Sequence, residues 1–150
     1  MNLSHSIYIM AIFSFFIQFF GMSLIMTNDF SNITFSLGKF YISTIMALLM
    51  AFVEIVMHDM FYYHFSTNYY LIVILSLAII IYSYRNQYYI GDKEFLKEMI
   101  EHHSMALLTT DEIMQKTENE YVKKLAENIN STQQNEINYM KKMLQMSAHI

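Results

Sequence analysis

The chain has 150 residues, 55% of them hydrophobic, and a formal net charge of -4. It contains no cysteine, which excludes disulfides, iron–sulfur clusters and thiol catalysis. No basic run is present to hold a phosphate backbone, so nucleic acid is not an expected partner.

Charge is distributed unevenly along the chain. Residues 1–84 contain one basic residue, Lys39, and three acidic residues, whereas residues 85–150 contain eight basic and ten acidic residues. This contrast predicts a membrane region over 1–88, followed by a water-facing domain over 89–150.

Three apolar runs are long enough to cross a bilayer of about 30 Å as helices. They are Ile7 to Met26, Phe40 to Met57 and Tyr69 to Tyr84. The segments TNDFSNITFSLGK and HDMFYYHFSTN between them are polar enough for loops. We therefore expect an integral, multi-pass membrane protein in contact with a lipid bilayer.

The basic residues near the expected spans indicate the orientation. Lys39, Arg85, Lys93 and Lys97 all fall on the side of the C-terminal part. The positive-inside rule places that side in the cytoplasm.

The second span contains a stripe of metal-ligating side chains at helical spacing: Met46, Met50, Glu54, Met57 and His58. Such a stripe is able to pass Cu(I) across a membrane. The alternative is that the methionines are ordinary apolar side chains of a membrane helix. Glu54 then either faces the bundle interior or snorkels to the interface.

From Gly91 onward the pattern changes to charged residues with helical periodicity. Asp92 is the expected N-cap of a first helix, and Thr117 to Glu120 reads as a capping box that opens a second helix. The short break between them predicts an antiparallel hairpin, so the fold class is all-α. Fewer than 70 residues form a marginal core, and the hairpin needs a partner. Either it dimerises into a four-helix bundle, or it packs on the membrane part.

The hairpin carries a candidate metal site. Met99, His102 and His103 share roughly one face of the first helix, and imidazole with thioether suits Cu(I). On the second helix Glu136 and Met140 are four residues apart, and antiparallel pairing can bring Met140 opposite Met99 or His103. The alternative interpretation is that both methionines fill the core and both histidines sit at its edge.

At these residues the chain resembles a known family, domain-of-unknown-function family 305, and in particular its membrane-anchored branch. The hallmark of that branch reads approximately M-I-P-H-H-S-x-A-I-x-T, with a second helix ending L-A-x-x-I-x-x-x-Q-x-x-E-I-x-x-M. The matching residues here are Met99 to Ser104, Ala106, Leu107 and Thr109, then Leu125, Ala126, Ile129, Gln133, Glu136, Ile137 and Met140. One departure is clear, because Glu101 stands where the family usually has proline.

The resemblance implies a ferritin-like, all-helical fold and copper binding, because some relatives hold copper in Met- and His-rich sites. We expect a non-enzymatic membrane protein that binds Cu(I) through Met99, His102, His103, Glu136 and Met140, for metal buffering or handling. The resemblance also favours a homo-oligomer. Two alternatives stay open: a copper-conducting transporter that uses Met46 and Met50, and a membrane scaffold assembled through the hairpin without metal.

Overall fold

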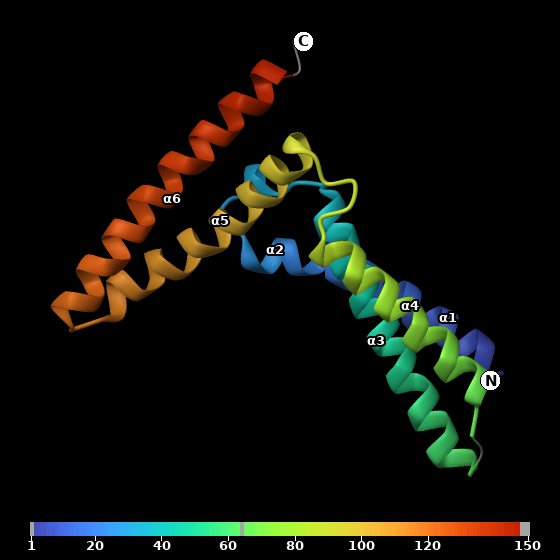
Figure 1. Ribbon diagram of the computed structural model, residues 1–150. Coiled ribbons are helices and arrows are strands. Elements are labelled where there is room, and N and C mark those ends of the chain that lie inside the picture. Colours follow the sequence, from blue (N-terminus) through green and yellow to red (C-terminus); the bar gives the residue numbers. More distant parts are fainter. Residues whose placement is uncertain (1, 64, 148–150) are drawn as a thin grey trace. The chain divides into compact units, whose positions relative to one another are not determined.

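The computed structural model describes residues 2–63 and 65–147, and all regular secondary structure in these ranges is helical (Figure 1). The expected all-α class is therefore confirmed. The elements, in order, are α1 Leu3–Phe16, a π-helical turn η1 Ile17–Gly21, α2 Met22–Met26, a 3-10 turn η2 Phe30–Asn32, α3 Leu37–Tyr62, α4 Thr67–Arg85, α5 Asp92–Lys116 and α6 Glu120–Ser147.

The helices form two compact units that interleave in the sequence. One, the three-helix unit, comprises Gly38–Tyr89 together with the chain up to Gly21. The other, the hairpin unit, comprises Met22–Leu37 together with the chain from Ile90 onward. The end of the first expected span, Met22–Met26, and the segment that joins this span to the second therefore pack with the C-terminal hairpin, which the sequence had not indicated.

Three helices are long and apolar enough to cross a membrane: Leu3–Met26, Leu37–Tyr62 and Thr67–Arg85. They contain the three expected spans. Residues 58–62, which we had assigned to a loop, are helical instead, because α3 continues to Tyr62. Asp59 explains the extension. Its carboxylate accepts hydrogen bonds from the amide (2.6 Å) and the hydroxyl (2.8 Å) of Ser66, the residue that caps α4.

The three-helix unit packs around a stripe on α3. Ser43, Ala47, Ala51, Ile55 and Asp59 recur every fourth residue and are all buried. Small side chains on such a stripe allow neighbouring helices to approach closely. Side chains from α1 and α4 pack against Ala51 and Ile55 from two directions.

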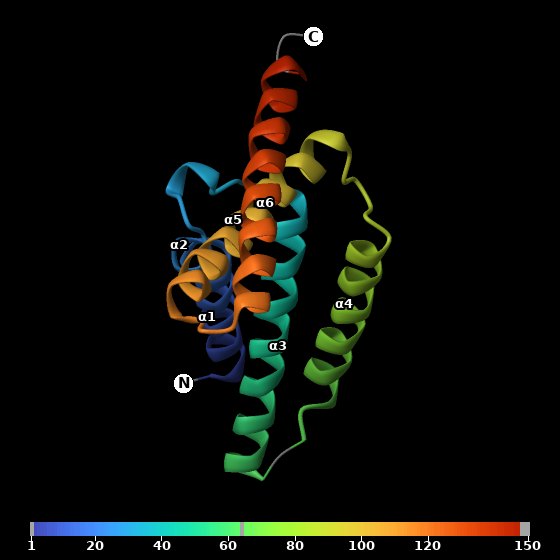
Figure 2. The same cartoon turned by 90° about the vertical axis from the view of Figure 1, so that its left-hand side faces the viewer.

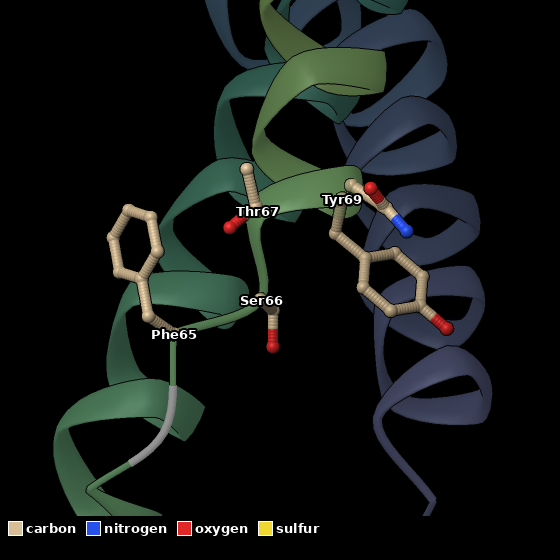
Figure 3. Close-up of a pocket in the computed structure, with 5 residues that line it drawn as sticks. Phe65, Ser66, Thr67 and Tyr69 are labelled. Carbon is tan, nitrogen blue, oxygen red and sulfur yellow. The ribbon is translucent and has the colours of Figure 1, made fainter.

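An open hollow lies at the start of α4, lined by Phe65, Ser66, Thr67, Asn68 and Tyr69 (Figure 3). The ring of Tyr69 points toward α1, where its hydroxyl lies 2.6 Å from the hydroxyl of Ser4.

In the hairpin unit, α5 and α6 lie side by side in opposite directions (Figures 1 and 2). Their core consists of Ile100, Leu107, Ile137 and Met140. Complete burial of an aliphatic side chain of this size contributes about 1.5–3 kcal/mol. Further along the hairpin, the amide of Asn130 donates to the Thr110 hydroxyl at 3.0 Å, which fixes the antiparallel register.

Both expected helix starts shift by one or two residues. Gly91, not Asp92, is the N-cap of α5, and Asp92 begins the helix, where a carboxylate complements the helix dipole. At α6 the cap is Asn119, not Thr117. The Asn119 side chain accepts from the amides of Tyr121 (2.9 Å) and Val122 (3.3 Å), which is ordinary N-cap geometry.

Polar contacts hold the segment 22–37 against α5. Glu101 accepts hydrogen bonds from the hydroxyl of Ser23 and from the amide of Thr34 (2.9 Å). Ser104 is fully buried and donates to the Asn28 side chain at 2.6 Å. Glu101, the residue that departs from the family pattern, thus has a structural role of its own: it anchors this segment.

The same segment makes two further contacts. The carboxylate of Glu94 accepts from the amide of Leu37 (2.7 Å) and from the Lys97 ammonium (2.7 Å). These contacts, led by the Lys97 hydrogen bond, hold the pKa of Glu94 below its ordinary value of 4.5. On α6, the Lys141 ammonium lies 3.3 Å from the Ser31 hydroxyl. The segment therefore covers one side of the hairpin and contacts both helices.

Candidate metal centre

His103 and Glu136 face each other across the two helices of the hairpin. The Nε2 of His103 lies 2.8 Å from an Oε of Glu136. An ionised carboxylate only accepts hydrogen bonds, so Nε2 carries a hydrogen, and in the neutral imidazole Nδ1 carries the lone pair. That Nδ1 is buried, and no group in the described chain donates to it. The pair therefore presents an oriented imidazole nitrogen that has no hydrogen-bond partner in the part of the chain that the structure describes.

Met99 and Met140 lie in one cluster. Met140 belongs to the buried core, and Met99 packs against that core from α5. Met99 is one turn before His103, and Met140 is one turn after Glu136, so the antiparallel pairing puts both thioethers on the same side of the His–Glu pair. Both are also ordinary core positions, which is the alternative interpretation of these residues.

The side chain of His102 does not point toward the His103–Glu136 pair. It is exposed, and its ring centroid is 6.4 Å from that of His103, with the ring planes at 68°. Adjacent helix positions point about 100° apart, which is the geometric reason. The structure thus brings His103 and Glu136 into contact and Met99 and Met140 into one cluster, and it leaves His102 on the surface.

The donor set limits which metals fit. Within the described residues, no group of three or more His, Cys, Asp or Glu side chains is arranged to hold a metal ion. Zn and Cu(II) prefer nitrogen, oxygen and thiolate donors, whereas Cu(I) accepts imidazole with thioethers. The expected ligands around His103 can therefore supply three donor atoms to a metal ion only if a thioether is one of the three.

The predicted stripe of metal-ligating side chains on α3 does not face in a single direction. Met46 and Met57 are exposed, whereas Glu54 points to α1 and accepts a hydrogen bond from the hydroxyl of Ser6. Met50 is half-buried. Two of the three methionines of the stripe thus lie on the outside of the three-helix unit.

Fold and site together define a class: an all-helical protein with three membrane-length helices and a hairpin that carries a cross-helix His–Glu pair. Residues 92–149 match the family described as "Domain of unknown function (DUF305)". The chain is 32% identical over 141 residues to a protein of Acanthamoeba polyphaga mimivirus described as uncharacterized, and the match covers 92% of this chain and 90% of that protein. The chain belongs to the DUF305 family. No solved structure matches it.

Proposed function

We propose that this protein is an integral membrane protein whose hairpin unit binds one Cu(I) ion for metal buffering or handling. His103 supplies the imidazole ligand, Met99 and Met140 supply thioethers, and Glu136 holds the imidazole in the required tautomer. His102 is an outer ligand that joins only if its side chain turns in from the surface. The ion undergoes no turnover in this function, and the protein is not an enzyme.

One observation carries the proposal: the buried Nδ1 of His103 has no hydrogen-bond partner among residues 2–63 and 65–147, while Nε2 is held by Glu136. Burial of a polar atom without a partner costs about 1–3 kcal/mol. A carboxylate on the far nitrogen of a ligating histidine is the usual outer partner in metal sites, where it fixes the ring and raises its basicity. A metal ion bound at Nδ1 uses this lone pair, to which none of the described residues donates a hydrogen bond.

The arrangement of the chain supports a membrane location for this site. In any three-span topology, the connection 27–36 and the hairpin lie on the same side of the bilayer. The hydrogen bonds of Asn28 and Thr34 to α5 satisfy that requirement. The basic residues beside the spans favour the cytoplasm for that side.

A Cu(I) titration of the full chain in lipid nanodiscs, under reducing conditions and against a competing chelator, tests the function. We expect one ion per chain, lost in His103→Ala and weakened in Met140→Leu, which conserves the core volume. Met143→Leu is the matched control, because Met143 is on the same helix but exposed. Binding that is unchanged in His103→Ala, while the variant keeps its helical circular dichroism, would overturn the proposal.

A further inference from the structure

Helix α6 carries two different apolar stripes. The first contains Ile137 and Met140 and packs on α5. The second runs the length of the helix, and each of its side chains is between 37% and 65% exposed. Its members are Val122, Leu125, Ile129, Tyr139, Met143 and Met146. A second apolar stripe, beside one that already packs on a neighbouring helix, is typical of a helix that contacts two neighbours, as in a four-helix bundle.

The spacing of the second stripe is that of a coiled-coil seam. From Val122 to Met146 the positions alternate three and four residues apart, with Thr132 and Glu136 in the two central places. Alternation of three and four over this length keeps one face toward a partner helix. Glu136, in one of the two central places, contacts His103 of α5, whereas the six apolar residues of the seam lie outside the core that fills the α5 side of α6.

No element of the hairpin unit covers the seam within the described chain. The segment 22–37 lies on the other side of the hairpin, where it contacts Glu101 and Ser104 of α5 and Lys141 of α6. On α5, Phe95 and Ile113 lie on the side away from that segment and are exposed, as the α6 seam is. The hairpin thus has one covered face and one exposed apolar face.

We propose that a second copy of this chain packs on the exposed face, with its α6 antiparallel to the first α6, and that the two hairpins form a four-helix bundle. The seam is palindromic about its centre, which argues for a second copy over a different protein. Antiparallel pairing sets Val122 opposite Met146, Leu125 opposite Met143, and Ile129 opposite Tyr139. Every apolar residue then meets an apolar residue, as an isologous two-fold interface requires.

The size of the face fits a stable dimer. A helical stretch from Val122 to Met146 is about 38 Å long at about 1.5 Å per residue. A face two helices wide is about 20 Å across, so each copy offers about 760 Å², close to the roughly 800 Å² per partner of stable complexes. The two central positions of the seam also pair across the interface, because Thr132 of each copy lies opposite Glu136 of the other. A threonine hydroxyl there donates to the carboxylate that holds His103, so the second copy contributes to the site described above.

Because the chain has no cysteine, introduced cysteines report the interface directly. Leu125→Cys with Met143→Cys, in the full chain in nanodiscs, should form a disulfide-linked dimer when oxidised with diamide in the absence of metal. The two positions are about 27 Å apart along one helix, so they cannot join within a chain. Leu125→Cys alone should stay monomeric on a non-reducing gel, because the two copies of residue 125 lie at opposite ends of the seam.

Two controls complete the experiment. Lys124→Cys with Gln145→Cys places exposed cysteines at matching heights on another side of α6 and should not cross-link. Leu125→Glu should halve the measured mass of the assembly, and Gln134→Glu, exposed on the same helix, should not. A monomeric natural chain, or a dimer that Leu125→Cys alone cross-links, would overturn the proposal. Because no metal is present, this result is independent of copper binding.

Discussion

The Nε2 of His103 lies 2.8 Å from the carboxylate of Glu136, a residue on the other helix of the hairpin. This contact joins two positions that are far apart in the sequence and fixes the tautomer of the imidazole. Its consequences for metal binding can be measured by changing the carboxylate and leaving the ring in place.

Glu136→Gln should lower Cu(I) affinity about 10- to 100-fold while keeping one ion per chain, because outer partners of ligating histidines typically contribute that factor. The amide keeps the shape of the side chain and removes its charge. Chelator competition measures the affinity. Glu127→Gln, an exposed position on the same helix, is the control and should bind as the natural chain does. Equal affinity in both variants would contradict a role for Glu136 in holding the ring.

Acid should loosen the segment 22–37 through Glu94. The folded state lowers the pKa of Glu94 below 4.5, chiefly through the Lys97 hydrogen bond, so this group stabilises the fold above about pH 4.5. That contribution is lost as the pH falls through the lowered pKa. Melting temperatures measured between pH 3 and 7 should show a difference between the natural chain and Glu94→Gln that shrinks at the acid end. Glu118→Gln should show no such convergence. A difference that is constant with pH would contradict the assignment.

Glu101→Ala should release the same segment at neutral pH. The variant leaves the buried Ser23 hydroxyl and the Thr34 amide without their acceptor, and loss of hydrogen bonds to a charged group costs about 1.5–3 kcal/mol. Chymotrypsin should then cut faster after Phe30 and Phe35. Glu112→Ala, which removes only an exposed pair with Lys116, serves as the comparison and should be cut at the natural rate.

Met46→Leu combined with Met50→Leu should leave Cu(I) binding by the hairpin unchanged. Leucine conserves the volume and apolarity of both side chains, and neither belongs to the hairpin unit. Uptake of copper by vesicles that contain the protein separates binding from transport. Uptake by the natural protein that disappears in the double variant would instead establish the transporter alternative.

Hydropathy was sufficient to predict the three membrane-length helices, because that signal is local to each run. The end of α3 was missed for a reason that is not local. His58 and Asp59 resemble loop residues in sequence, but Asp59 is stabilised by Ser66, which lies beyond the turn. Similarly, the spacing placed Glu136 within reach of a histidine, and only the register of the two helices selects His103 over His102.

The role of segment 22–37 was also invisible in the sequence. A signal existed: Glu94, Lys97, Glu101 and Ser104 form a polar stripe on α5 at spacings of three and four. From the sequence we noted Glu101 only as a departure from the family pattern beside the histidines. In the fold these four residues receive a distant segment, and no periodicity within α5 identifies which segment that is. Ferritin-like topology, which the family resemblance implied, stays a prediction.

The interleaving of the two units bears on how the chain is made. Residues 22–37 leave the ribosome well before α5 exists, and they must wait for it while α3 and α4 are synthesised. Asn32, which is buried in the finished fold and donates to the Ser104 hydroxyl of α5 at 3.2 Å, therefore lacks that partner until α5 has been synthesised. Contacts between distant segments form late, since loop closure precedes them. Completion of the hairpin unit therefore requires that α3 and α4 have already been made, and a fragment that begins at residue 90 lacks the segment that completes it.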